Sequence, residues 1–196
     1  TGYVTVAERA PDVARHPDLP DAMRVAGSAV FVMPAGHDAG RWRYVAGAHW
    51  RHPQGPGSSI AGRDSHPVVH VAYEDALAYA RWLGRELPTE AQWEYAARGG
   101  LQAQPYVWGR DFAPARRPMA NTWQGAFPLA DTGDDGHRGT SPVGCFAANG
   151  YGLYDMAGNV WQWTSTWYTP GHSGRPETDP LGPDEAHSFD PRQPGV

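Results

Sequence analysis

Lysine is absent from the sequence, and all sixteen basic side chains are arginine. The 21 acidic residues outnumber them, which gives a formal net charge of −5 at pH 7. A nucleic-acid-binding domain needs a concentrated basic surface to meet the phosphates, and this composition does not provide one. We therefore expect no nucleic-acid partner.

Cysteine and long apolar runs are equally scarce. The single cysteine, Cys145, cannot form an internal disulfide, so nothing indicates an oxidising compartment. No apolar run approaches the roughly 18 residues of a membrane helix, and the opening residues TGYVTVAERA lack the basic start and apolar middle of a signal peptide. These absences predict no membrane partner and a cytoplasmic location of the bacterial type.

Aromatic residues, glycine and proline are plentiful. Nine Trp and nine Tyr are too many for a disordered chain, whereas 24 Gly and 19 Pro favour loops over regular elements. With 40% hydrophobic content, the chain fits one compact domain or most of a larger one. No linker divides it, so we expect a single domain over residues 1–196. The lack of an initiator Met and the loop-like ending DPRQPGV indicate a piece of a longer protein.

Local patterns predict three helices. Thr5 and Glu8 form a capping-box pattern that would start a short helix through Ala10. Apolar residues at helical spacing predict a second helix over residues 74–84.

The third helix carries the clearest local signal, in LPTEAQWEYAARGG at residues 87–100. Thr89 can cap this helix, Gln92 occupies its third position, and Gly99 ends it.

Strands are expected where β-branched and aromatic residues lie between Gly and Pro, over residues 27–34, 41–45 and 66–73. The alternation in WQWTS predicts another strand over residues 161–165. The remainder of the chain beyond residue 101 has the pattern of loops.

Two loop segments could carry metal chemistry. The first, residues 120–143, crowds oxygen donors into a glycine-rich stretch: Asn121, Thr122, Asp131, Asp134 and Asp135. Ca²⁺ takes six to eight such oxygens in flexible geometry, but Asn and Asp also close ordinary turns with their own backbone. Both interpretations stay open on the residues alone.

The second segment, NGYGLYDMAGNVWQWTSTWY at residues 149–168, surrounds one carboxylate with aromatic rings. Asp155 is its obvious hard ligand, and Gly158 and Asn159 allow the backbone to turn and present carbonyls. The alternative is an aromatic core around a hydrogen-bonded Asp. The histidines show no zinc-site spacing, and Cys145, with no base beside it in sequence, is expected to be a small core residue.

Five fragments occur in order with matching separations: HPVVHVAYEDALAYARWLGRELPTEAQWEYAARGG, YVWG, NTWQGAFP, TGDDG and NGYGLYDMAGNVWQWTSTWY. Together they resemble the formylglycine-generating enzymes, the sulfatase-modifying factors. The resemblance implies an α+β fold of the irregular C-type-lectin-like kind, with little regular secondary structure. It also implies an oxidase that uses O₂ and copper to convert the cysteine of a CxPxR motif in unfolded sulfatase polypeptides to Cα-formylglycine.

The resemblance further implies structural calcium at two sites. The first would use Asn121, the backbone of Thr122, Asp135 and the backbone of His137, and the second would use Asp155, carbonyls near Gly158 and Val160, and the side chain of Gln162. The family usually has an acid in place of Gln162. Because glutamine offers a neutral oxygen, we expect weaker calcium binding at the second site.

The copper cysteines of the family lie in a segment resembling GGSxxCxxxxC, which this chain does not contain. We therefore expect an incomplete domain whose copper ligands lie outside the chain, with no catalytic residue to assign and no activity of the chain alone. Trp42 is expected to line the peptide groove, because a flat ring can hold an extended peptide. The isolated chain should be marginally stable, since its Trp-rich surface needs partners.

Two other activities remain open for this sequence. Ergothioneine-type sulfoxide synthases carry a related domain with histidine-ligated iron, but NTWQGAFP and TGDDG favour the formylglycine-generating enzymes. A lectin-like paralogue that keeps the fold and binds partners without copper chemistry is the third hypothesis, because fold does not fix function.

Overall fold

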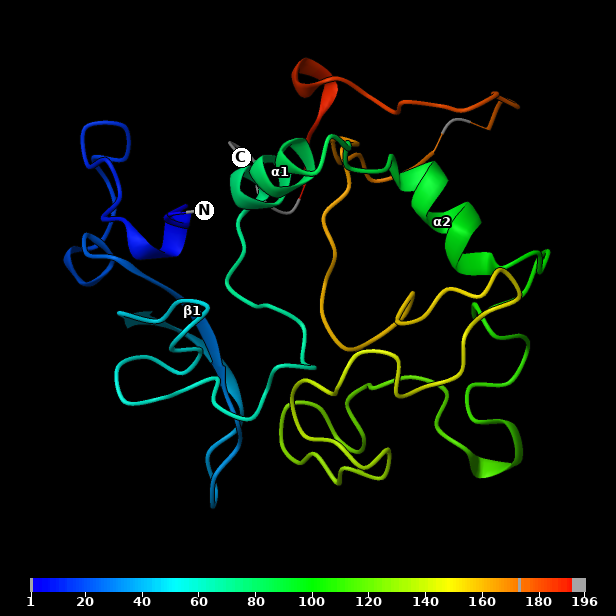
Figure 1. Ribbon diagram of the computed structural model, residues 1–196, viewed down its shortest axis with the longest axis horizontal. Coiled ribbons are helices and arrows are strands. Elements are labelled where there is room, and N and C mark those ends of the chain that lie inside the picture. The colour runs from blue at the N-terminus through cyan, green and yellow to red at the C-terminus, as the bar shows by residue number, and fades with distance from the viewer. Residues whose placement is uncertain (1, 173, 192–196) are drawn as a thin grey trace.

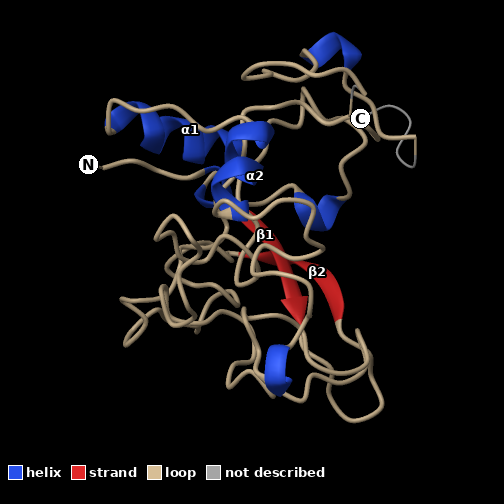
Figure 2. Cartoon of the chain, turned by 90° about the vertical axis from the view of Figure 1, so that its right-hand side faces the viewer, coloured by secondary structure: helices blue, strands red, loops and turns tan. Residues whose placement is uncertain are grey.

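Loops make up most of this protein, whose structure is a computed structural model that describes residues 2–172 and 174–191. Its regular elements are helices α1 (Tyr73–Trp82) and α2 (Glu90–Arg98) and strands β1 (Gly27–Val32) and β2 (Arg41–Ala46). Four single 3₁₀ turns complete them: η1 (Val6–Glu8), η2 (Asp21–Met23), η3 (Pro114–Arg116) and η4 (Glu185–His187). Both helices lie toward one end of the molecule, and the β1–β2 hairpin and the loops from residue 101 to 160 lie toward the other (Figures 1 and 2).

The hairpin forms where its sequence predicts strands. β1 and β2 pair antiparallel, with Gly27 opposite Ala46 and Val32 opposite Arg41. β1 ends at Val32, ahead of Pro34, which cannot donate to a ladder. At the far end of the hairpin, Phe31 packs its ring against those of Trp42, Trp123 and Phe127, with centroids 5.4 to 5.8 Å apart. This aromatic cluster attaches the hairpin to the loop that follows residue 120.

Helix α1 begins without a capping side chain, because Ala72 occupies the N-cap position. Asp75, in the first turn, compensates by accepting a hydrogen bond from the Ala72 N–H at 2.9 Å. The same carboxylate accepts hydrogen bonds from the Val6 N–H at 3.0 Å and the Tyr3 hydroxyl at 2.9 Å. Asp75 is 4% exposed, so one buried acid joins the start of the chain to α1.

Helix α2 has the ends that its sequence predicts. Thr89 Oγ1 accepts from the Gln92 N–H at 3.1 Å, and Gln92 Oε1 accepts from the Thr89 N–H at 3.0 Å. Gly99 adopts the left-handed conformation, with φ 56°. It lies so close to Gly150 that a Cβ on Gly150 would come within 2.2 Å of the Gly99 oxygen. Only glycine fits this contact between the helix end and the NGYG loop.

Two expected strands do not form. Residues 66–73 and 161–165 have no strand partner in the described part of the chain, and His70 has a positive φ of 59°. A strand needs a neighbour for its backbone groups, and the only sheet of the described residues is the β1–β2 hairpin. The helix expected to run through Ala10 is likewise only the turn η1.

The buried apolar core is small. Its members among the described residues are Ala7, Val30, Ala48, Ala80, Ala97 and Ala120. The large aromatic side chains are half-buried or exposed, and Trp161 is 100% exposed. No described helix is long and apolar enough to cross a membrane.

Asp75→Ala should lower the free energy of unfolding by about 2 kcal/mol, because it leaves the Val6 and Ala72 N–H groups without their acceptor. Urea unfolding of the full-length protein measures this. Glu74→Ala is the matched control: it removes the neighbouring carboxylate, which is 76% exposed and pairs with the exposed Arg9, and should cost less than about 1 kcal/mol. Equal losses in the two variants would refute the role given to Asp75.

A second acid, Glu8, organises the N-terminal turn. Its Oε2 accepts hydrogen bonds from the Thr5 N–H at 2.9 Å and the Thr5 hydroxyl at 2.8 Å, and the Trp50 indole N–H donates to the same oxygen at 3.3 Å. The other oxygen, Oε1, accepts from Arg51 at 2.8 Å. Above all, the bond from the Thr5 N–H holds the pKa of the Glu8 carboxyl below its ordinary value of 4.5.

A lowered folded-state pKa stabilises the protein above the unfolded-state pKa, and that contribution is lost as the pH falls through the folded-state value. We therefore expect the unfolding free energy to decline below about pH 4.5, with a shallower decline in Glu8→Gln. Thermal unfolding at stepped pH measures both slopes, with Glu86→Gln as the control for losing one exposed carboxylate. An unchanged slope in Glu8→Gln would contradict the expectation.

Candidate functional site

The first candidate loop brings together the residues that its sequence pattern groups. Asp135 accepts hydrogen bonds from the Thr122 N–H at 2.9 Å and from the His137 N–H at 3.0 Å. Asn121, next in sequence to Thr122, is 7% exposed and donates its amide N–H to the Gly139 carbonyl at 2.8 Å. One carboxylate, one amide oxygen and neighbouring backbone carbonyls are therefore gathered within one loop.

The first loop is joined directly to the second. The Asn159 N–H donates to the Asn121 carbonyl at 2.8 Å, and the Asn159 side chain bonds both the N–H and the carbonyl of Ser141, at 2.9 and 3.1 Å. Gly158 has φ 73°, and a Cβ there would come within 2.3 Å of the Asn121 oxygen. The Gly-Asn turn thus lies flat against the first loop.

In the second loop, the predicted ligands contact one another and the protein backbone. Asp155, at φ 53°, accepts the Gly144 N–H on Oδ2 at 2.7 Å. Gln162 donates its amide Nε2–H to the Asp155 carbonyl at 2.7 Å, while its Oε1 accepts from the Trp93 indole at 3.3 Å. The side chain of Gln162 therefore closes this loop through its nitrogen.

The two donor sets differ in how well they suit a hard cation. The first loop offers carboxylate, amide and carbonyl oxygens, which are the ligands that Ca²⁺ prefers. In the second loop the Gln162 nitrogen, which cannot ligate a cation, faces the Asp155 carbonyl. This arrangement does not fit a cation at Gln162. In the described ranges no three or more His, Cys, Asp or Glu side chains are grouped so that they could hold a metal ion, so either site would depend on amide and backbone oxygens.

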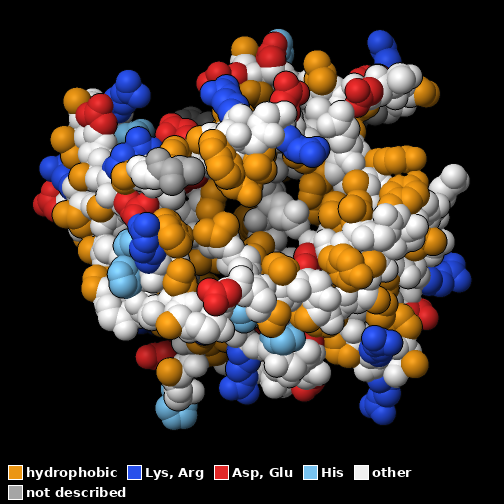
Figure 3. Space-filling view, viewed as in Figure 1, with side chains coloured by type: hydrophobic (Ala, Val, Ile, Leu, Met, Phe, Trp, Pro, Cys, Tyr) orange, Lys and Arg blue, Asp and Glu red, His pale blue; other side chains and the backbone are white. Residues whose placement is uncertain are grey.

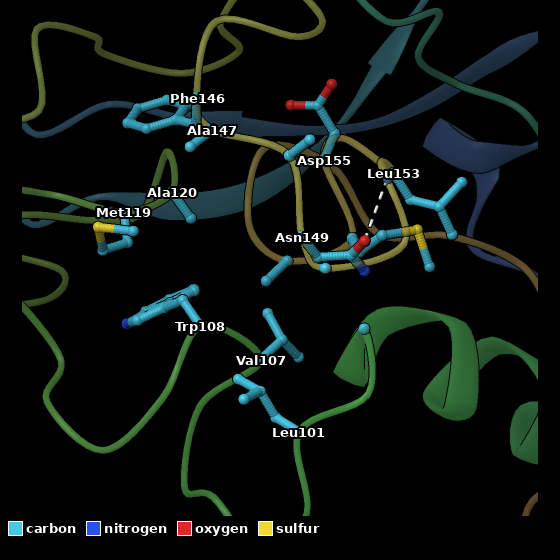
Figure 4. A pocket seen from close by; sticks show the side chains of 15 residues that line it. Leu101, Val107, Trp108, Met119, Ala120, Phe146, Ala147, Asn149, Leu153 and Asp155 are labelled. Carbon is cyan, nitrogen blue, oxygen red and sulfur yellow. Dashed lines mark hydrogen bonds between the residues drawn. The ribbon is translucent and has the colours of Figure 1, made fainter.

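A cavity of about 260 Å³ lies behind the second loop (Figure 4). Its walls are mainly apolar and come from Leu101, Val107, Trp108, Met119, Phe146 and Leu153, with Asn149 and Asp155 among its polar members. Asn149 Oδ1 accepts the N–H groups of Tyr151 and Leu153, and its Nδ2 donates to the last carbonyls of α2. This one amide fixes the cavity wall to the helix.

Cys145 is exposed, so its interpretation as a core residue is wrong. The fold places the His137 ring beside it, with Nε2 3.8 Å from the sulfur. One thiol does not fit a copper site that takes two thiolates, and no catalytic step follows from Cys145.

Trp42 projects from β2, is 65% exposed, and packs its ring edge-on against Phe31.

Sequence reasoning missed the linking role of three polar residues: Asp75, Asn149 and Asn159. The partners that they link over long range lie between 18 and 72 positions away, so no local pattern shows them. A weak signal was available for the two asparagines, because each is adjacent to a glycine and Asn tolerates tight turns.

The chain is similar to known proteins over most of its length. A family model described as "Sulfatase-modifying factor enzyme 1-like domain" matches residues 12–187. The formylglycine-generating enzyme of Mycobacterium tuberculosis is 56% identical over 177 residues, which are 88% of this chain and 59% of that protein. The mouse "Inactive C-alpha-formylglycine-generating enzyme 2" is 53% identical over 140 residues, 71% of this chain and 44% of that protein.

Among solved structures, PvdO from Pseudomonas aeruginosa matches with a TM-score of 0.53 and 33% identity, over 79% of this chain and 56% of that one. This chain thus spans little more than half of that structure and of the bacterial relative. The family match and the structural neighbour agree with the loop-rich architecture of few helices and one small sheet. The chain belongs to the formylglycine-generating enzyme, or sulfatase-modifying factor, family.

Proposed function

We propose that the full-length protein is a formylglycine-generating oxidase that acts on the cysteine of a CxPxR motif in an unfolded sulfatase polypeptide. The observation that carries the proposal is the 56% identity over 177 residues to a relative named for that activity. The reaction replaces the cysteine C–S bond with a C=O bond, and the sulfur leaves as sulfide. O₂ takes two electrons from the substrate and two from an external thiol reductant, and is reduced to water.

Copper has no ligand set in this chain. Cu(I) prefers soft thiolates, and Cys145 is the only thiol in the sequence. The proposal therefore assigns the copper ligands to a part of the protein outside this chain. Within the chain, the residues proposed to act are those that bind the peptide and those that hold the loops.

Trp42 is proposed to form a wall of the peptide groove. Its indole is exposed and is backed by the Phe31 ring, so the face left open is rigid. A flat aromatic face can contact an extended backbone without reading each side chain, which suits a substrate that is bound unfolded.

The proposal includes structural calcium, with the first loop as the stronger site. Asp135, Asn121 and the carbonyls of Thr122 and His137 would supply the oxygens there. At the second site, Asp155 and the carbonyls near Gly158 and Val160 would supply the oxygens, and binding would be weaker because Gln162 adds no charge and turns its N–H, not its oxygen, toward the Asp155 carbonyl.

Gln162→Glu should raise calcium affinity at the second site by at least about tenfold, because a carboxylate adds a charged oxygen and removes the N–H donor. Isothermal calorimetry of the metal-free full-length protein measures it. Gln54→Glu, which adds an acid at an exposed position outside both candidate loops, is a control for added charge alone. Unchanged affinity in Gln162→Glu would contradict the second calcium site.

A non-catalytic role is the second candidate, because the mouse relative named as inactive is 53% identical to this chain over 140 residues. Such a protein would keep the fold and could still bind the peptide. Only conversion of the substrate separates the two roles.

The copper-loaded full-length protein, incubated with a CxPxR peptide, O₂ and a thiol reductant, should convert the peptide thiol to an aldehyde that mass spectrometry detects. A CxPxR peptide with Ser in place of Cys should stay unchanged. Peptide that binds but stays unconverted by fully loaded protein would point to the non-catalytic role.

The same assay tests Trp42. We expect Trp42→Ala to raise the KM for the peptide about tenfold or more while leaving kcat within about twofold, since it removes binding surface without touching the reacting atoms. Tyr79→Ala, which truncates an exposed aromatic residue on α1, is the control. Equal KM and kcat values in the two variants would show that Trp42 does not line the groove.

A further inference from the structure

A second cavity, of about 370 Å³, shares Trp108, Met119 and Ala120 with the cavity behind the second loop, so these three residues lie between the two (Figure 4). Its other walls come from the chain around η3 and from the first candidate loop, and they include Phe112, Arg116, Pro118, Thr122, Gln124 and Asp134. We call this cavity the Arg116 pocket. A concave site of this size, with apolar walls and a few polar groups, is the usual form of a small-molecule site.

Two opposite charges lie on the wall of the Arg116 pocket. Residues 101–120 run at the lower right of Figure 1, and basic side chains lie there among apolar ones (Figure 3). Neither the Arg116 nor the Asp134 side chain has an ion-pair or hydrogen-bond partner among the described residues. The neighbouring Asp131 and Asp135, by contrast, both accept backbone N–H groups. One free guanidinium and one free carboxylate on the wall of a single pocket suit a ligand that carries both charges.

The aromatic wall of the pocket is held in place by the protein itself. The Trp108 indole N–H donates to the Asp111 carbonyl at 2.9 Å, and the Tyr106 ring stacks on the indole with centroids 5.4 Å apart and planes 4° apart. The Phe112 ring lies 6.4 Å from the indole at an angle of 53°. A fixed aromatic surface loses little conformational entropy when an apolar group packs against it.

The backbone that carries Arg116 has an unusual conformation. Ala115 and Arg116 both lie in the left-handed region, with φ 50° and 64°, which residues other than glycine rarely adopt. The Arg116 N–H donates to the Ala113 carbonyl at 2.9 Å, which holds this turn. Strained backbone of this kind clusters at ligand sites, and here it fixes the residue that bears the free guanidinium.

We propose that the Arg116 pocket binds a free α-amino acid with a large apolar side chain, such as phenylalanine or leucine. The ligand carboxylate pairs with the Arg116 guanidinium, whose parallel N–H groups match two carboxylate oxygens. The ligand ammonium group pairs with Asp134, and Gln124 Oε1, which accepts no hydrogen bond from a described residue, is a further acceptor. The ligand side chain packs against Trp108 and Phe112.

The charges of the pocket favour an amino acid over other small ligands. A nucleotide would bring its phosphates next to Asp134, in a loop that also holds Asp131 and Asp135, and like charges repel. A simple amine would leave Arg116 without a partner, and a simple carboxylic acid would leave Asp134 without one. An internal peptide segment has neither a free amine nor a free carboxylate on its backbone.

A set of three related ligands tests the proposal by isothermal calorimetry of the full-length protein at a fixed calcium concentration. Phenylalanine should bind with a Kd below about 1 mM. Phenylalaninamide lacks the carboxylate and 3-phenylpropionate lacks the ammonium group, so each should bind at least about tenfold more weakly. Equal binding of the three ligands would overturn the proposal, as would the absence of binding by both phenylalanine and leucine.

Variants of the two charged residues assign each ligand group to its partner. Arg116→Gln should bind phenylalanine at least about tenfold more weakly and should no longer prefer it to phenylalaninamide. Asp134→Asn should likewise lose the preference for phenylalanine over 3-phenylpropionate. Arg117→Gln is the matched control, because it removes the adjacent exposed arginine outside the pocket wall, and it should leave the Kd within about twofold. An Arg116→Gln variant that still prefers phenylalanine to its amide would overturn the proposal.

None of these measurements depends on copper or on conversion of a peptide, so the amino-acid site and the oxidase activity can fail separately. A competition experiment separates the pocket from the site of the substrate polypeptide. A CxPxR peptide should leave the Kd for phenylalanine unchanged. Displacement of phenylalanine by this peptide would assign the pocket to the substrate and overturn the proposal.

Discussion

The hydrogen bond from the Asn159 N–H to the Asn121 carbonyl, 2.8 Å long, is the contact on which the loop half of the molecule depends. It forms only because Gly158 has no Cβ, and it places the Asn159 side chain across both backbone groups of Ser141. No helix or strand satisfies the backbone of these three segments in the described structure. Side-chain amides do so instead, which gives irregular chain a defined geometry.

Both candidate metal loops inherit their shape from this contact. The first presents Asp135 between two backbone N–H groups, and the second places Asp155, just before the Gly-Asn turn, against the Gly144 N–H. Gln162 then distinguishes them, because an amide can close a loop with a hydrogen bond where an acid can only accept one. The choice between an amide and an acid at position 162 therefore changes how strongly a bound cation would stabilise the second loop.

Local chemistry predicted the elements that depend on nearby residues. The caps of α2 lie within a few positions of each other, and the hairpin follows from β-branched runs bounded by Gly and Pro. The strands expected at 66–73 and 161–165 did not form, because a strand is defined by a partner and the described chain offers none. The links of Asp75 and Asn149 to distant segments went unpredicted because these bonds span 52 or more positions. The family, by contrast, was evident from ordered fragments, which record shared ancestry and not local energetics.

The contact between Gly99 and Gly150 has a consequence for how this protein can vary. Two positions 51 apart in sequence each require the smallest side chain because of the other, so substitution of either one is blocked by the backbone of its partner. Neither glycine can therefore be replaced by a single substitution without disrupting the contact. Libraries that randomise one of these glycines while keeping the other should recover almost nothing but glycine. For the same reason, the NGYG loop can be grafted onto another scaffold only where the residue that ends the facing helix is also glycine.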